Sequence, residues 1–394
     1  MAVNIPKLIE IRDNIINDLK ASLGIFSSIF GKNFLFIFSG VLAAKIKLLY
    51  LTIADVQKNL APDLADSELN GGTLERWGRL KLGRNPFPAR DGIFSCIING
   101  DIGAVIPSGT TFKSDDSSSA PGYLFVVDSD YTIAAQPDLI EVRSLESGTD
   151  SGLIIGDTLS ATSPILNVST VITVDSEVQT PLDPEPIEDY RAKVVEAEQL
   201  EPQGGAASDF RLWSYDAQGV KKSYPYAKSG NSAEVNVFIE ATVSDSTDGK
   251  GTPPQTILDD VASVIEFDPD TTKPLYERGR RPLGVFVVDV LPITPFDVSV
   301  TLSGLTDTSA LIVTTVEDAL RSYINTVRPF VAGADAYENR NDILSVTKLS
   351  YVVVSALPNN VLFNTLSFSV GGVTTNTYQF LNGNIPYFDS LTVA

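Results

Sequence analysis

The sequence predicts a multidomain α+β protein with four parts: an N-terminal helical bundle segment at 1–90, a β-rich central domain at 91–180, and two C-terminal α+β domains at 181–290 and 291–394. Three observations predict this division. Apolar residues recur with helical spacing in the first part, short β-rich runs begin near residue 91, and helical and strand patterns mix after a proline-rich stretch at 181–186.

The first part carries an apolar repeat whose spacing alternates between four and three residues. This spacing keeps apolar side chains on one side of a helix, and it predicts helices at 5–30 and 40–60 with a break at 31–33. Pro62 is expected to end the second helix. Two interpretations stay open: an internal hairpin of the two helices, or a surface that binds partner chains. The central positions of this predicted seam are Leu19, Leu23, Leu42, Ile46, Leu49, Ile53 and Val56.

The run at 34–44 is the most membrane-like stretch of the sequence, and it lies between Lys32 and Lys45. Its 11 residues are fewer than the roughly 20 that a helix needs to cross a bilayer. We therefore expect this run to be buried in protein, with no targeting segment and no membrane insertion.

From residue 91 onward, β-rich runs alternate with clusters of Gly, Asp, Ser and Pro, a pattern typical of an all-β domain. The polar stretch at 114–121 is expected to be a flexible loop. The predicted strands lie at 93–98, 123–127, 131–134, 140–144 and 168–174.

The remaining sequence mixes both kinds of pattern and shows no internal repeat. Helices are expected at 187–200, 207–215, 252–267, 309–327 and 341–349. Strands are expected at 220–224, 234–240, 284–290, 297–302, 352–355, 365–370 and 376–380.

Composition excludes several classes of function. The chain has 29 basic and 49 acidic residues, and a net charge of −20 repels the phosphates of nucleic acids. It has no histidine, which removes histidine-activated nucleophiles, histidine metal sites and the usual general base near neutral pH. Its single cysteine, Cys96, excludes an intrachain disulfide and is expected to be a buried apolar side chain. We expect no enzyme activity, cofactor or metal.

The closest carboxylate pairs in loops are Asp245 with Asp248 and Asp268 with Asp270, and both are expected to be solvated turn residues. The segment around Lys250 lacks the first glycine of a phosphate-binding loop and also fails the calcium-loop pattern. The basic patch of Arg278, Arg280 and Arg281 is expected to be a partner contact or a solvated loop.

Several stretches, in order, carry a family resemblance. They lie at 60–68, 72–78, 82–89, 106–112, 201–213, 281–284 and 381–392. Together they resemble the baseplate J-like family of contractile-tailed phages and related injection machines. Each motif position is expected to build shape, in short helices, tight turns and close packing. These positions are Trp77, Pro107, Gly109, Gly204, Gly205, Trp213, Pro282 and Gly284.

The resemblance implies a structural wedge protein of a phage tail baseplate, assembled in the bacterial cytoplasm and present as two copies in each of six wedges. Its N-terminal helices would join a bundle with another wedge protein, and its C-terminal domains would link neighbouring copies into a ring. Contacts with hub or sheath-initiating proteins are also expected. Domain hinges are expected at 181–186 and, second, at 291–295. The alternatives are a tail-associated polysaccharide depolymerase and a receptor-binding tail protein.

Overall fold

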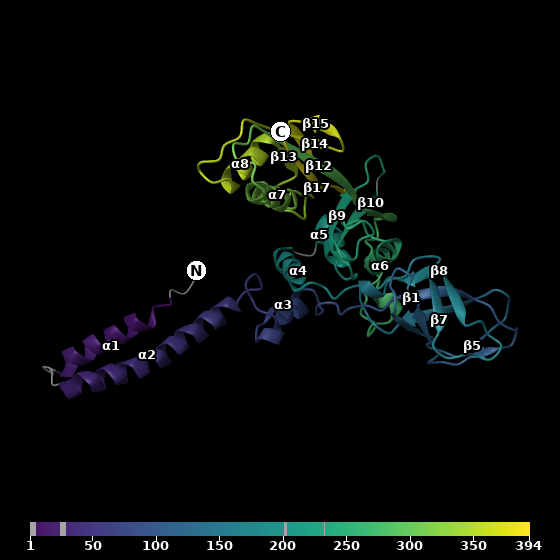
Figure 1. Ribbon diagram of the computed structural model, residues 1–394, viewed down its shortest axis with the longest axis horizontal. Coiled ribbons are helices and arrows are strands. Elements are labelled where there is room, and N and C mark those ends of the chain that lie inside the picture. The colour runs from purple at the N-terminus through teal and green to yellow at the C-terminus, as the bar shows by residue number, and fades with distance from the viewer. Residues whose placement is uncertain (1–4, 24–28, 201–202, 232) are drawn as a thin grey trace. The chain divides into compact units, whose positions relative to one another are not determined.

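The computed structural model describes residues 5–23, 29–200, 203–231 and 233–394, and the side chains of these except for residues 23 and 29–33. The chain divides into two compact units (Figure 1). Unit 1 comprises residues 1–85 and 190–198, and unit 2 comprises residues 86–189 and 199–394. The protein is α+β and multidomain, as the sequence predicts; the exact boundaries of the four predicted parts stay a prediction.

Unit 1 begins with two antiparallel helices, α1 (Leu8–Leu23) and α2 (Ile29–Lys58), which pack side by side (Figure 1). The predicted break at 31–33 and the predicted start of the second helix at 40 are wrong, because α2 is already helical from Ile29. A single glycine such as Gly31 costs a helix only about 1 kcal/mol. The packing of Leu35, Ser39 and Ala43 against α1 helps to offset this cost.

The rest of unit 1 is a small core around α3 (Leu74–Lys81), which follows the short helix η1 (Glu68–Asn70). The buried residues of this core are Ala65 and Leu74, together with Tyr190 and Val194 from α4 (Ile187–Gln199). Trp77 is half-buried against it, whereas Leu80, expected to help anchor the helix, is exposed.

Unit 2 begins with a closed β-barrel whose strands follow the order β1-β6-β4-β3-β7-β8. The predicted β-rich domain is therefore a barrel, and each of its five predicted strands overlaps an observed one. The short β2, β3 and β7 were missed, because two to four residues carry little alternation. The barrel strands are β1 (Ile93–Ile98), β3 (Thr111–Ser114), β4 (Leu124–Val126), β6 (Asp138–Ser144), β7 (Thr158–Ala161) and β8 (Val171–Gln179); β2 (Val105–Ile106) pairs with β5 (Tyr131–Thr132).

The loop at 114–121 is not the free polar loop that its composition predicts. The buried carboxylate of Asp157 accepts hydrogen bonds from the backbone N–H groups of Ile154 (2.9 Å) and Ser119 (3.2 Å), and from the Ser119 hydroxyl. Asp115 accepts from the hydroxyls of Thr158 (2.6 Å) and Ser160 (2.8 Å). The loop's polar residues therefore fasten it to the barrel.

The proline-rich segment 181–186 is also bonded on both sides. The backbone of Leu182 pairs with that of Arg90, whose guanidinium contacts Asp260 at 2.7 Å. Asp183 accepts hydrogen bonds from the N–H and hydroxyl of Thr149, both at 3.0 Å. The segment joins the barrel to the next domain through ordered contacts.

The following α+β region contains a three-stranded sheet of order β11-β10-β9. The strands β9 and β10 are antiparallel, whereas β10 and β11 are parallel. The core on one face of this sheet includes Phe210, Val237, Ile239 and Val261. The elements of this region after α4 are α5 (Ala207–Ser214), β9 (Val220–Ala227), β10 (Glu234–Ala241), α6 (Gln255–Glu266), η3 (Leu275–Glu277) and β11 (Val287–Pro292).

The C-terminal region is a four-stranded sheet of order β15-β14-β12-β17 packed with α7 and α8. The predicted strand at 352–355 is wrong, because it lies within α8. The helix predicted at 341–349 is displaced, because α8 begins only at Val346 and residues 343–345 form the strand β13. The valines at 352–354 favour a strand locally, but Leu349 and Val353 lie one helical turn apart in the core, and this packing decides the conformation. The elements are β12 (Thr294–Ser303), α7 (Ala310–Ile324), η4 (Tyr337–Asn339), β13 (Ile343–Ser345), α8 (Val346–Ala356), β14 (Thr365–Val370), β15 (Val373–Thr375), β16 (Thr377–Gln379) and β17 (Asn384–Val393).

Candidate interaction surface

The contact between α1 and α2 is made by a narrow stripe of side chains. Ile11 of α1 is buried there, together with Leu35, Ser39 and Ala43 of α2. Ser39 and Ala43 are small, which lets the two helices approach closely. The guanidinium of Arg12 covers the ring of Phe36 at 4.6 Å. The internal hairpin therefore forms. Leu35 and Ser39 continue the predicted seam toward the start of α2 with the same spacing of four and three, and only Ala43 is offset by one residue, from Leu42.

The predicted seam of α2 faces solvent over most of its length. Leu49 is 60% exposed and Ile53 is 48% exposed, and Leu42 and Val56 are also exposed. Ile46 and, on α1, Leu19 are half-buried; the side chain of Leu23 lies outside the described residues. Because α2 has 30 residues and α1 has 16, the C-terminal part of α2 extends beyond α1.

The apolar run at 34–44 is mostly exposed, so the prediction that it is buried is wrong for this chain by itself. Only Leu35, Ser39 and Ala43 of that run are buried, because one neighbouring helix covers one face of α2. Contiguous apolar surface of this kind usually marks an interaction site. The exposed apolar residues of α2 are Phe34, Phe36, Ile37, Phe38, Val41, Leu42, Leu48, Leu49, Leu51, Ile53 and Val56.

Among the described residues, one helix, at Phe34–Lys58, is long and apolar enough to cross a membrane. The run at 34–44 alone is too short to cross a bilayer, and Lys45 and Lys47 follow it. The sequence is apolar again from Leu48 onward, so the whole helix is long enough. This criterion uses length and composition alone. Helices packed in soluble bundles also satisfy it.

The motif residues of the resemblance lie in separate places rather than in one site. Two of them meet: a Cβ on Gly205, whose φ is 116°, would lie 2.5 Å from the Cγ of Pro282. That close approach and the left-handed backbone explain the glycine. Gly109 (φ 82°) follows Pro107 in a turn that leads to the buried Phe112, and Trp213 packs edge-to-face on Phe210. Gly204 also has a positive φ, and Gly284 is exposed.

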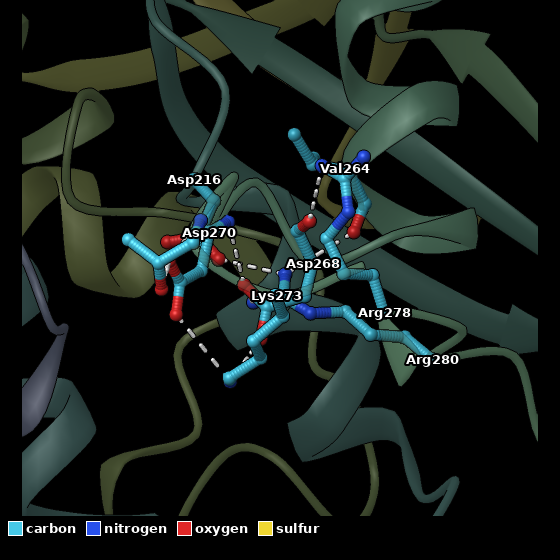
Figure 2. Close-up of polar contacts among 8 residues, drawn as sticks. Asp216, Val264, Asp268, Asp270, Lys273, Arg278 and Arg280 are labelled. Atoms are coloured by element: carbon cyan, nitrogen blue, oxygen red, sulfur yellow. Dashed lines mark hydrogen bonds and ion pairs between the residues drawn. The ribbon is translucent and has the colours of Figure 1, made fainter. Parts of the chain in front are cut away.

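The four loop carboxylates are occupied by local bonds. Asp245 is buried and accepts from the Thr242 hydroxyl at 2.6 Å, and burial raises its pKa. Asp248 accepts from the Thr252 hydroxyl at 2.7 Å. The ammonium nitrogen of Lys273 lies 3.3 Å from a carboxylate oxygen of Asp268 and 3.6 Å from one of Asp270 (Figure 2).

Within the described ranges, no group of three or more His, Cys, Asp or Glu side chains could hold a metal ion. Burial raises the pKa of Cys96 to about 12, which keeps its thiol protonated.

Sequence reasoning missed the buried charges that join the two C-terminal regions. Arg211 of α5 is buried and contacts Asp335 at 2.6 Å. Glu240 of β10 contacts Arg328 at 3.0 Å, Lys221 at 3.1 Å and the Tyr224 hydroxyl at 2.7 Å. Burial alone would raise the pKa of Glu240, but the two cations lower it to about 2. These partners lie up to 124 residues apart, so no local sequence signal reveals them.

Comparison with known proteins connects the barrel to a family. Residues 95–180, nearly the whole barrel, match the family model described as the baseplate J-like protein barrel domain. The chain is 26% identical over 132 residues to the Mu-like prophage FluMu protein gp47 of Haemophilus influenzae, over 34% of this chain and 36% of that protein. The match thus spans about a third of that relative's length. A chain in the cryo-EM structure of the anti-feeding prophage (AFP) baseplate, 6-fold symmetrised, is similar at a TM-score of 0.42 and 8% identity, covering 97% of this chain and 90% of that chain.

Proposed function

We propose that this chain, whose residues 95–180 match the baseplate J-like barrel domain, is a structural wedge component of the baseplate of a contractile-tailed bacteriophage. The family match confirms the resemblance predicted from the sequence. The protein acts by assembly and carries out no catalysis. It is located in the virion tail and assembles in the cytoplasm of the bacterial host.

The observation that carries this proposal is the uncovered apolar seam of α2, with Leu42, Leu49, Ile53 and Val56 in water. The spacing of these residues follows the three-and-four rule of bundle-forming helices. The hairpin with α1 leaves them free, since it uses Leu35, Ser39 and Ala43. A second copy of the chain and another wedge protein supply the helices that cover the seam.

The C-terminal domains link neighbouring copies into a ring, and two copies occupy each wedge. Both expected hinges, 181–186 and 291–295, make ordered contacts in this structure. The Ile293 N–H bonds to the Ile239 carbonyl at 3.1 Å, and the Thr294 N–H bonds to the Gly383 carbonyl at 3.0 Å. The segment 181–186 stays our first hinge candidate, although its contacts with Arg90 must change if it moves.

The proposal is tested by Leu49→Glu, assayed by copurification of the intact chain with the wedge protein encoded in the same phage. We expect loss of copurification, because the charge must be desolvated when the seam is covered. The barrel and the two α+β regions of unit 2 should stay folded, since Leu49 is exposed in the free chain. Deleting residues 1–60 should give the same result.

The matched control is Leu51→Glu. Leu51 is also an exposed leucine of α2, but two residues along a helix correspond to a rotation of about 200°, so it faces away from the seam. Normal stoichiometry with Leu49→Glu, or equal loss with both variants, would contradict the proposal. Stable binding of the intact chain to lipid vesicles would also contradict it, because the apolar helix would then serve a membrane.

A further inference from the structure

The barrel is joined to the rest of the chain by two paired strands. Three positions beyond the last pair of the β1–β8 ladder, and in the same register, Arg90 lies opposite Leu182. The Arg90 N–H donates to the Leu182 carbonyl at 2.8 Å, and the Leu182 N–H donates to the Arg90 carbonyl at 3.2 Å. We call residues 86–92 and 180–186 the proline ribbon, because five of them are prolines.

The ribbon and the barrel form one body. The ribbon continues two barrel strands, and further bonds hold it to the barrel. The Gly92 N–H donates to the Ser144 hydroxyl and the Ser144 N–H donates to the Gly92 carbonyl, both at 2.8 Å. Asp183 accepts from the N–H and hydroxyl of Thr149. Because these contacts lie on both strands of the ribbon, any motion of the barrel carries the ribbon with it.

The ribbon contacts the β9–β11 region through a single apolar side chain. Among the described residues of the ribbon, Leu182 is the one that belongs to the apolar core of that region, where it is fully buried. No peptide bond joins the ribbon directly to this core, since the chain passes through residues 187–206 before it reaches α5. Packing and polar contacts therefore hold the ribbon in place.

The polar contacts of this interface are partly open to water. The guanidinium of Arg90 contacts Asp260 of α6 at 2.7 Å, and the two side chains are 19% and 42% exposed. The hydroxyls of Thr180 and Thr256 are hydrogen-bonded. Further bonds run from the Gln218 amide to the carbonyls of Pro88 (2.8 Å) and Asp183 (3.4 Å), and from the Asp183 N–H to Asp245 (3.3 Å). Small polar interfaces of this kind permit domains to move.

The interface between the β9–β11 region and the C-terminal region has the opposite character. It contains the largely buried ion pairs Glu240–Arg328 and Arg211–Asp335. An apolar cluster adds to them, and its buried residues are Tyr224, Ile293, Val331, Ala334 and Ile385. Separating these two regions would leave buried charges without partners, so they stay together.

We propose that the barrel and the proline ribbon leave and rejoin the β9–β11 region as one body, with Leu182 as the plug and the Arg90–Asp260 pair as the clasp that opens. The proposal rests on the proposed wedge function, in which two copies of one sequence occupy each wedge. Bending within 181–186 would break the pairing of Leu182 with Arg90, whereas release of the whole ribbon keeps it. The expected hinge thus acts by release.

The first test replaces Leu182 by Cys in the full chain and measures the rate of reaction with N-ethylmaleimide under native conditions by mass spectrometry. The new thiol is accessible only when the ribbon leaves its site. We expect it to react at least about tenfold faster than Cys96, since local opening requires less free energy than unfolding of the barrel core that buries Cys96. Asp260→Ala should accelerate the reaction at 182 and leave Cys96 unchanged, because it removes the clasp.

The matched control is Val237→Cys, on the central strand β10 of the same core, where the native side chain is also fully buried. This thiol should react as slowly as Cys96. A rate at 182 no faster than at 96 or 237, or a rate unaffected by Asp260→Ala, would overturn the proposal. The experiment uses the free chain, so its outcome does not depend on the wedge proposal.

A second test fixes the ribbon with a disulfide. Thr180→Cys/Thr256→Cys joins the ribbon to α6, and Thr111→Cys/Thr162→Cys is the matched control, a hydroxyl-bonded threonine pair within the barrel domain. The first oxidised variant should copurify with the wedge protein in fewer copies than wild type, and reduction should restore the number. The control should behave as wild type. Full stoichiometry of the oxidised first variant would show that assembly requires no release, whereas failure of wild type to copurify would count against the wedge proposal alone.

Discussion

The carboxylate of Glu240 accepts hydrogen bonds from Arg328 at both of its oxygens: from Nε at 3.1 Å and from Nη2 at 3.0 Å. The two residues lie 88 positions apart and join the β9–β11 sheet to the C-terminal region. Both side chains are largely withdrawn from water. A buried pair of this kind fixes one relative orientation of the two regions. Any other orientation would separate the two side chains and leave an unpaired charge buried in the protein.

We expect Arg328→Met to destabilise unit 2 by about 3–5 kcal/mol, because it leaves Glu240 with less compensation in a buried site. The double variant Glu240→Met/Arg328→Met should recover much of that loss, since no buried charge of the pair remains. Chemical denaturation of the wild type, both single variants and the double variant measures the coupling. Strictly additive losses would show that the pair contributes no coupling.

Acid should weaken the same contact. The pKa of Glu240 is about 2 in the folded protein, below its ordinary value of 4.5. Its contribution to stability is therefore complete above pH 4.5 and is lost as the pH falls toward 2. The stability difference between wild type and Glu240→Gln should be constant above pH 4.5 and should shrink below it, as followed by denaturation at a series of pH values. If the stability difference between wild type and Glu240→Gln instead grew in acid, the pKa of Glu240 would be raised in the folded protein rather than lowered.

Gly78 of α3 packs directly on Tyr190, since an added Cβ would lie 1.6 Å from the tyrosine oxygen. We expect Gly78→Ala to destabilise unit 1 by about 1–3 kcal/mol, the usual cost of overpacking a core. Gly40→Ala is the matched control, because nothing lies within 4 Å of its added Cβ and alanine favours a helix by up to about 1 kcal/mol. Thermal unfolding should therefore move in opposite directions for the two variants. A shift in the same direction would contradict the assigned packing.

Asp157 holds the 114–121 loop on the barrel, and burial of its carboxylate makes the loss of these bonds costly. Asp157→Ala should destabilise the barrel by about 1–3 kcal/mol, the cost of leaving buried donors unpaired. It should also open the loop to proteases. Asp116→Ala, at an exposed position in the same loop, is the control and should change neither property. Equal protease resistance of the two variants would show that Asp157 does not fasten the loop.

The sequence by itself determined the order of helical and β-rich regions, because period and turn chemistry are local properties of the chain. Ile93–Ile98 and Thr365–Val370 lie where alternation predicts them. The family resemblance was also visible in sequence, since its motifs depend on glycine, proline and tryptophan at turns and close contacts. The lack of histidine removed histidine-activated nucleophiles and histidine metal sites from the expected chemistry without any structure.

Only the tertiary structure decided how much of the α2 seam is covered by α1. Leu35 and Ile53 are 18 residues, or five helical turns, apart and lie on the same side of α2, but the 16-residue α1 is too short to cover Leu49 and Ile53, which stay exposed. Packing also overrode the local strand preference of 352–354, which lies in α8. The buried partners of Glu240 and Arg211 come from distant parts of the chain, and a charge shows nothing in sequence about whether it will be desolvated. These features depend on long-range contacts, which is why the sequence could not show them.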